Sequence, residues 1–364
     1  MPAPPSIRST PTGVAAFVGA AGGKGPLEEA HPVASLADYV RVFGRSARAT
    51  ALGRAVESFF ANGGERVWVV SVSRRAHRPP VAQLVGTRRG GTGLYALADT
   101  EFDVLAIPDG GRLEPRAAAA IVRKAAAVAS ARRAFYVVDP PQGLGVADVA
   151  RWARTLPDVA DAACVWPHLS LAAAGRAAPS GAVAGVMARI DRASGVWKPP
   201  AGTAAALTGV KGPARTATES ELATLVAARV NPLRRLPDGR TVLWGSRTLS
   251  GDPDWKYVSV RRYVLFLERS IDRGLQWTVF EPNGQALWNS VRRTVEDFLF
   301  NQFEAGALRG NEPSDAFFVR CDRTTMTQDD IDNGRLVCLV GVAPVHPAEF
   351  VIVRIGGWAG RCRR

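Results

Sequence analysis

Apolar residues follow two different periods along the first half of the chain. The stretches between five short apolar runs place apolar side chains three and four residues apart, as amphipathic helices do. This alternation of strand and helix signals predicts α/β layering with a largely parallel sheet. The five runs, typical of buried strands, are VAAFVG (14–19), RVWVVSV (66–72), VLAIP (104–108), AFYVVD (134–139) and AACVWP (162–167).

Local signals mark where several of these helices begin and end. Ser35 is placed to cap a first helix that ends at Gly44, and Gly63-Gly64 stops a second one. An Ala-rich helix begins near Glu114. Residues 74–93 are rich in Arg, Pro and Gly and predict an exposed loop.

The composition changes between residues 170 and 215, where Gly, Pro, Ala and Ser dominate and single apolar residues alternate with breakers. We therefore expect a domain junction there. Beyond it, Thr218-x-x-Glu221 predicts a capping box at the start of a helix. The remaining elements predicted for the second half are helices at 261–271 and about 283–303, and strands WTVFE (277–281), AFFVRC (316–321), VCLVGVAPV (337–345) and FVIVRIGGW (350–358).

Length and composition favour a folded chain of more than one domain. The 364 residues exceed the usual size of one core, and 47% hydrophobic with 22% charged residues is a globular composition. The net charge of +13 fits nucleic acid, a membrane surface or an acidic protein partner equally well. Because the basic residues come as scattered pairs and form no block, we favour protein surfaces, with solvated faces for most pairs.

The two ends of the chain suggest a soluble protein made in the cytoplasm. The start has no apolar core of a signal peptide, and the apolar run Leu336 to Val345 is too short to span a bilayer. Four prolines in residues 1–12 suit an extended arm, although a frayed terminus fits equally well. Cys338 fits a small buried hydrophobe, and the four cysteines indicate neither a zinc site nor a disulfide framework.

The chemistry of known enzyme sites is mostly missing. Gly19-Ala-Ala-Gly-Gly-Lys-Gly25 resembles a phosphate loop, but it lacks one residue of the spacing and has Gly25 where a magnesium-binding hydroxyl is needed. None of the four histidines forms an H-x-x-x-H pair, and we interpret His168 and His346 as loop residues. We predict no catalytic residue, cofactor or metal. An α/β nucleotide-binding enzyme and a basic nucleic-acid-binding protein stay open as alternatives.

A family resemblance covers most of the chain. The segment SVRRYVLFLERSIDRGLQWTVFEPNGQALWNSVRRTVEDFLFNQFEAGALRG (259–310), with its Arg-Arg helix, W-x-x-F-E-P-N turn and long helix, resembles the C-terminal domain of contractile tail sheath proteins. Residues 13–26, 62–72, 184–202, 231–250 and 315–355 are similar as well. The resemblance implies a two-domain α/β sheath subunit with extended terminal arms. Its parts would be residues 1–22, an arm and a strand joining the inner α+β domain; 23–202, the outer α/β domain; 203–349, the inner C-terminal domain; and 350–364, a C-terminal strand and arm.

The resemblance also implies a function. Sheath subunits of this family polymerise helically around an inner tube and contract to drive that tube through a target envelope, as part of a phage tail or an injection particle. The partners it implies are identical subunits, an inner tube protein, and baseplate and cap proteins, with no nucleic acid and no stable membrane insertion.

Two sets of residues are candidates for contacts in such an assembly. The first is a charged helical surface for the inner tube, Arg292 and Arg293; each stands four residues before an acidic residue, which predicts two intrahelical ion pairs worth about 0.2–0.5 kcal/mol each. The second is a strand donated to a neighbouring subunit, a role that suits its β-prone residues. That strand comprises Phe350, Val351, Ile352, Val353, Arg354 and Ile355.

Overall fold

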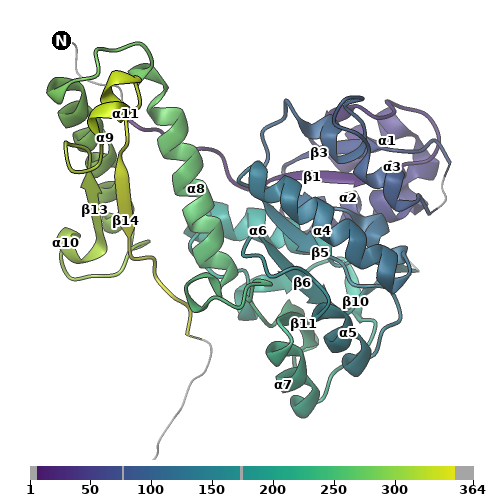
Figure 1. The fold of residues 1–364 in the computed structure, drawn as a ribbon. Helices are drawn as coiled ribbons and strands as arrows, with labels where there is room; N and C mark the ends of the chain where they lie inside the picture. Colours follow the sequence, from purple (N-terminus) through teal and green to yellow (C-terminus); the bar gives the residue numbers. More distant parts are fainter. Residues whose placement is uncertain (1–5, 76–77, 173–174, 349–364) are drawn as a thin grey trace, which may run out of the picture.

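The computed structural model describes residues 6–75, 78–172 and 175–348. A nine-stranded mixed sheet runs through the larger of two bodies (Figure 1), and its six strands from β3 to β11 in the order below are parallel. The strands, in spatial order, are β2 (Ala30–Val33), β3 (Arg66–Ser71), β1 (Val14–Gly19), β4 (Val104–Ala106), β5 (Phe135–Val138), β6 (Ala162–Trp166), β11 (Val230–Arg235), β12 (Thr241–Leu243) and β9 (Ala206–Leu207).

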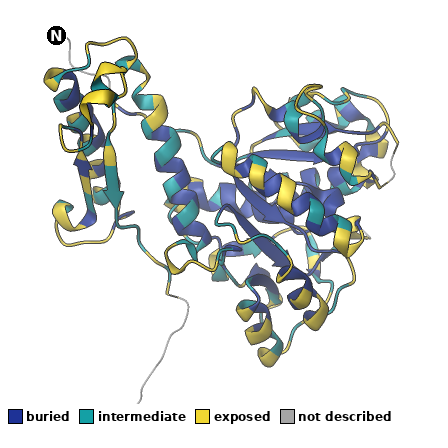
Figure 2. Ribbon diagram, viewed as in Figure 1, coloured by how far each residue is buried: buried dark blue, intermediate teal, exposed yellow. Residues whose placement is uncertain are grey.

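Helices cover both faces of this sheet. Successive strand residues point to opposite faces, so Phe17 belongs to one hydrophobic core while Ala16 and Val18 belong to the other. The strands accordingly lie buried between helices whose outer faces are exposed (Figure 2). One face carries α1 (Leu36–Phe43), α2 (Ala51–Ala61) and α6 (Ser180–Ser194); the other carries α3 (Val81–Val85), α4 (Pro115–Ala131), α5 (Val146–Ala153) and α7 (Glu219–Ala227).

The smaller, C-terminal body comprises residues 275–348 and has its own cores. Helix α8 (Val258–Gly274) stands between the two bodies (Figure 1). The C-terminal body contains α9 (Gln285–Glu304), α10 (Pro313–Ala316), β13 (Phe317–Arg320), α11 (Gln328–Asp332) and β14 (Leu339–Val342). A separate small sheet of β10 (Val210–Pro213), β7 (Leu169–Leu171) and β8 (Arg176–Ala177) lies in the α/β body.

Much of the predicted pattern is confirmed. All five apolar runs of the first half are strands of the large sheet. Ser35 caps α1 by accepting a hydrogen bond from the Asp38 amide at 3.0 Å. Thr218 and Glu221 form the predicted capping box of α7.

The N-terminal strand lies elsewhere than expected. We grouped it with the C-terminal half, but β1 pairs with β3 on one side and β4 on the other, in the middle of the α/β sheet. Strands β9, β11 and β12, from residues 206–243, belong to the same sheet. The physical reason is that every residue of β1 after Val14 is buried, which requires helices on both faces.

The Gly-rich stretch at residues 170–215 is not the domain junction that we expected. It contains α6, a helix of 15 residues buried over most of its length. A Cβ at Gly181 would lie 2.3 Å from the Ala55 carbonyl oxygen, and one at Gly185 would lie 2.4 Å from that of Phe59. The glycines therefore serve close packing of α6 on α2 and do not break the chain.

The strand predicted at 277–281 is also wrong. Residues Gln276–Thr278 form a short 3-10 helix, and Phe280 has a φ of 72° with a fully exposed side chain. A left-handed backbone at a bulky residue marks a turn and cannot continue a strand. The apolar residues of this segment therefore form a turn and not a buried strand.

Substituting Gly185 with Val should destabilise the protein by about 1–3 kcal/mol or more, because the added side chain would push α6 away from the α2 backbone. Denaturant titration of the purified chain would measure this loss. The matched control is Gly110→Ala, since a Cβ at this buried glycine meets no atom closer than 3.6 Å. Equal stability of the two variants would contradict the packing argument.

Candidate functional site

Helix α8 is shared by both bodies. Its Val258 and Leu265 pack into the core of the α/β body, while Tyr263, Phe266 and Leu267 pack into that of the C-terminal body. A helix with apolar side chains on more than one side is buried on more than one side. Helix α8 is therefore a main connection through which movement of one body is transmitted to the other.

A buried ion cluster fixes α8 against the sheet. Arg262 donates to both carboxylate oxygens of Asp191 on α6 at 2.8 and 2.6 Å and to Asp103, just before β4, at 3.1 Å. All three side chains are at least 96% buried. Asp103 also accepts from the amides of Gly13 and Val14, at 3.0 and 2.7 Å. One guanidinium thus joins α8, α6, β4 and the start of β1.

The charges in this cluster depend on one another. Burial raises the pKa of Asp191, and the charge and hydrogen bonds of Arg262 act against that rise. The same burial acts to lower the pKa of Arg262, but the two carboxylates outweigh it and raise that pKa overall. The cluster is consequently stable only with all its partners present. Sequence reasoning missed it and treated Arg261-Arg262 as one of several scattered pairs. One feature of the sequence could have indicated its burial: Arg262 lies between Val260 and Tyr263, next to the apolar side chains of the helix.

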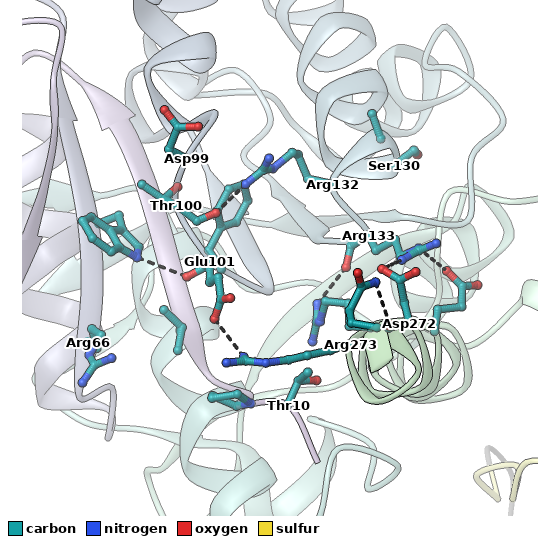
Figure 3. A pocket seen from close by; sticks show the side chains of 18 residues that line it. Thr10, Arg66, Asp99, Thr100, Glu101, Ser130, Arg132, Arg133, Asp272 and Arg273 are labelled. Carbon is teal, nitrogen blue, oxygen red and sulfur yellow. Dashed lines mark hydrogen bonds and ion pairs between the residues drawn. The ribbon is translucent and has the colours of Figure 1, made fainter. Parts of the chain in front are cut away.

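Beside this cluster, a cleft of about 980 Å³ lies between α8 and the amino-terminal ends of β1 and β3 (Figure 3). Arg273 pairs with Glu101 across it at 3.3 Å, and Arg133 pairs with Asp272 at 3.0 Å. Arg269 donates to the Arg133 carbonyl at 2.7 Å. These exposed ion pairs contribute about 0–1 kcal/mol each, so they align the surfaces while the buried cluster holds them together.

The N-terminal segment lies along the same helix. Thr10 donates its amide to the Ser270 hydroxyl at 3.0 Å, and Ile7 is buried against Gly274 in the core of the C-terminal body. Residues 6–12 contain no helix or strand. Through Thr10 and Ile7, this part of the predicted arm packs on its own subunit.

The C-terminal body presents a two-stranded sheet. Strands β13 and β14 are antiparallel, with Phe317 opposite Val342 and Arg320 opposite Leu339. Within residues 6–75, 78–172 and 175–348, neither strand has a second strand neighbour, so each has one unpaired edge. The inner face packs on the core, whereas Phe318 and Leu339 on the outer face are 48% and 50% exposed.

The structure locates the predicted tube-contact residues on α9. Arg293 is exposed, and Arg292 is half-buried with its Nε 4.0 Å from the Glu296 carboxylate. One of the two predicted ion pairs is therefore present, and an Arg293–Asp297 pair is not among the ion pairs of the described residues. The predicted donated strand, Phe350 to Ile355, lies outside the described residues.

The phosphate-like loop is a turn whose backbone amides are already in use. The Ala20 amide donates to Asp109 at 2.8 Å, and Ala21 donates to Ser71 at 3.2 Å. The amides of Gly22 and Gly23 donate to carbonyls at 3.2 and 2.8 Å. A phosphate loop needs such amides free to surround its anion, so this segment cannot act as one.

The described histidines do not take part in any group that could hold a metal ion. Burial, with a smaller contribution from Arg176, lowers the pKa of His168 to about 4, so it is neutral near pH 7. His346 is exposed beside Tyr257. No group of three His, Cys, Asp or Glu side chains that could hold a metal occurs among the described residues.

Another buried acid, Asp139, has a structural partner. It accepts from the Ser180 amide at 2.9 Å and from the Ser180 hydroxyl at 2.5 Å, which anchors the start of α6. Burial raises the pKa of Asp139 to about 7, against the effect of these hydrogen bonds. Both side chains are buried, so this pair is placed to hold α6.

Comparison with known proteins gives one consistent answer. The phage tail sheath protein central domain matches residues 88–249, and the phage tail sheath C-terminal domain matches residues 250–356. The sheath of the anti-feeding prophage, solved in its contracted state, is 30% identical, covers 96% of this chain and 95% of its own, and has a TM-score of 0.79. The chain belongs to the contractile tail sheath family.

Two further relatives agree with this assignment. The sheath complex of the extracellular contractile injection system PVC, in its contracted state, is 27% identical, covers 98% of this chain and 94% of its own, and has a TM-score of 0.83. The tail sheath protein of Enterobacteria phage T4 is 25% identical over 171 residues, which are 46% of this chain and 25% of the T4 protein. These matches identify a structural sheath subunit. In the described residues no helix is long and apolar enough to cross a membrane.

Replacing Arg262 with Met should destabilise the protein by about 3–5 kcal/mol, because two carboxylates would stay buried without a counter-charge. Burial raises the pKa of Asp191, and the variant would lack the guanidinium that opposes this rise, so the folded variant binds more protons than the unfolded chain. Its stability relative to wild type should therefore fall as the pH rises above the ordinary aspartate pKa of 3.8.

Denaturant titration at several pH values would measure both effects. Arg273→Met, which removes an exposed ion pair, is the matched control and should change stability by less than about 1 kcal/mol. If Arg262→Met were as mild as the control, α8 would not depend on the buried cluster.

Proposed function

We propose that this chain polymerises helically around an inner tube and that the polymer contracts to drive the tube through a target envelope. The observation that carries the proposal is the two-stranded sheet β13–β14, in which each strand has one edge that no other described strand pairs with. Unpaired edges attract strands from other chains. In a subunit built for polymerisation, they are the natural sites for arms of neighbouring subunits.

The end of the chain supplies a suitable strand. FVIVRI (350–355) is rich in β-branched and apolar residues and follows β14 after a short connection. Donated to a neighbour, it would form backbone hydrogen bonds along an open edge of that neighbour's sheet. Such a contact joins two different surfaces, and contacts of this kind produce an open helix whenever the rotation does not close a ring.

The partners follow from this assembly. Identical subunits would form the sheath, an inner tube protein would line it, and baseplate and cap proteins would close its ends. Support for a baseplate comes from the anti-feeding prophage baseplate, which contains a chain that is 27% identical to this one and has a TM-score of 0.80. We propose a subunit made in the cytoplasm and then built into a phage tail or injection particle, with no enzymatic activity and no cofactor.

The domain roles follow the same proposal. Helix α9 with Arg293 would face the inner tube, and the α/β body would project outward. Energy for contraction would be stored in the packing of identical interfaces, which requires no bound nucleotide. The ion cluster around Arg262 would keep the two bodies of one subunit together while neighbouring subunits rotate.

Removal of residues 350–364 should leave a folded, soluble protein that no longer forms tubes, because a donated strand adds little to its own core. Circular dichroism would report the fold, and negative-stain electron microscopy would report the tubes. A matched control removes only the basic end, residues 361–364, and should still assemble. Unfolding of the longer truncation, or tubes of wild-type appearance, would refute the proposed strand exchange.

Arg293→Glu should weaken co-assembly with the inner tube while leaving the unfolding temperature nearly unchanged. The exposed side chain contributes little to stability, but a contact worth about 0.2–1 kcal/mol is repeated at every subunit along a tube. Co-sedimentation with purified tube protein would measure it. Arg89→Glu, an exposed arginine in the loop of the α/β body, is the charge-matched control. Equal co-sedimentation of the two variants would remove Arg293 from the contact.

A further inference from the structure

Two cysteines far apart in the sequence meet at one end of the β13–β14 sheet. Arg320 and Leu339 are the last paired residues of the ladder, and one step further along the same register lie Cys321 and Cys338. Cys321 belongs to the small core around Trp288, and Cys338 packs against the same core, so both side chains lie on the inner face of the sheet. Directly opposite residues of an antiparallel pair have Cα atoms about 4.5–5.5 Å apart, which lies within the range that a disulfide spans.

The surroundings hold the two thiols in place. Thr325 donates its hydroxyl to the Val337 carbonyl at 2.8 Å, which closes the chain next to Cys338. Cys321 is buried with Leu287 and Trp288 of α9, whereas Cys338 is only half-buried. We had expected Cys338 to be a small buried hydrophobe, and it does pack against this core, although it is only partly buried.

The two thiols differ in reactivity. A hydrogen bond with Cys338, together with burial, raises the pKa of Cys321, and the same hydrogen bond lowers the pKa of Cys338. The charged groups that act on the pair are Asp322 and Arg292 near Cys321, and Glu296 near Cys338. Cys338 is also the more accessible of the two thiols, which suits the attacking nucleophile of a thiol–disulfide exchange.

We propose that Cys321 and Cys338 are a redox modification site that forms a reversible disulfide across the β13–β14 sheet when the protein meets a low-molecular-weight disulfide. The Cys338 thiolate attacks one sulfur of that disulfide, forms a mixed disulfide and releases one thiolate. Cys321 then loses its proton and attacks the Cys338 sulfur, which releases the second thiolate. The protein loses two electrons and two protons, and the small disulfide gains them as two thiols.

The consequence concerns the sheet that we propose as the acceptor of neighbouring strands, and this part rests on the proposed function. The disulfide would close the loop of residues 322–337 and keep β13 and β14 from separating. A particle could assemble with reduced subunits inside a cell and acquire cross-linked sheets in an oxidising medium. The site itself does not depend on the polymer.

The test is incubation of the purified wild-type chain with oxidised glutathione, followed by non-reducing peptide mass mapping and thermal unfolding. We expect a peptide linking Cys321 to Cys338, and a rise in the unfolding temperature of about 5 °C that dithiothreitol reverses. Cys338→Ser should abolish the link and the rise. Cys362→Ser and Cys164→Ser, which remove the other two cysteines, should retain both.

Failure to recover the 321–338 link from soluble, folded protein would overturn the proposal, as would a link that leaves the unfolding temperature unchanged. Because the reaction is followed on wild-type protein, a poorly folded variant does not obscure the result. Tube formation by reduced protein is scored separately. The disulfide can therefore fail while the sheath function stands, and the reverse also holds.

Discussion

The contact of Arg262 with Asp191 and Asp103 is the interaction on which the arrangement of this molecule depends. A buried ion cluster adds little to stability when compared with a well-packed apolar group. It does, however, require one particular geometry, because a misplaced partner leaves a buried charge unpaired. Here it fixes the rotation and height of α8 against α6, β4 and the start of β1. Since α8 also supplies Tyr263 and Phe266 to the second core, the same cluster determines where the C-terminal body stands.

This arrangement suits a subunit that must move without deforming. The α/β body is a closed unit, with helices over both faces of its sheet. The C-terminal body, in contrast, has strand edges that are unpaired within the described residues, and its Phe318 and Leu339 are exposed. In a monomer such edges are a hazard for aggregation. We propose that in a sheath these edges are where neighbours attach, so that force received at β13–β14 would reach the α/β body through α8.

The sequence predicted what depends on local pattern and missed what depends on distant partners. The five apolar runs and the caps at Ser35 and Thr218 were predictable, because burial on both faces and capping leave signatures within a few residues. The placement of β1 between β3 and β4 was not, since strand order is set by contacts across the chain. The glycines around Gly185 predict an interruption of helical structure when only the sequence is considered. The reason for Gly185 is visible only in the fold, where the α2 backbone leaves no room for a side chain. The ion cluster of Arg262 and the pairing of Cys338 with Cys321 were missed for the same reason, because these partners are neighbours only in the fold.

The most direct measurement of the central claim is a cryo-electron microscopy reconstruction of the purified full-length chain assembled alone or with its tube protein. The account predicts hollow helical polymers in which strands from neighbouring subunits extend the β13–β14 sheet, while the Arg262 cluster remains intact within every subunit. Protein that stays monomeric, or polymers in which both edges of that sheet are bare, would contradict it.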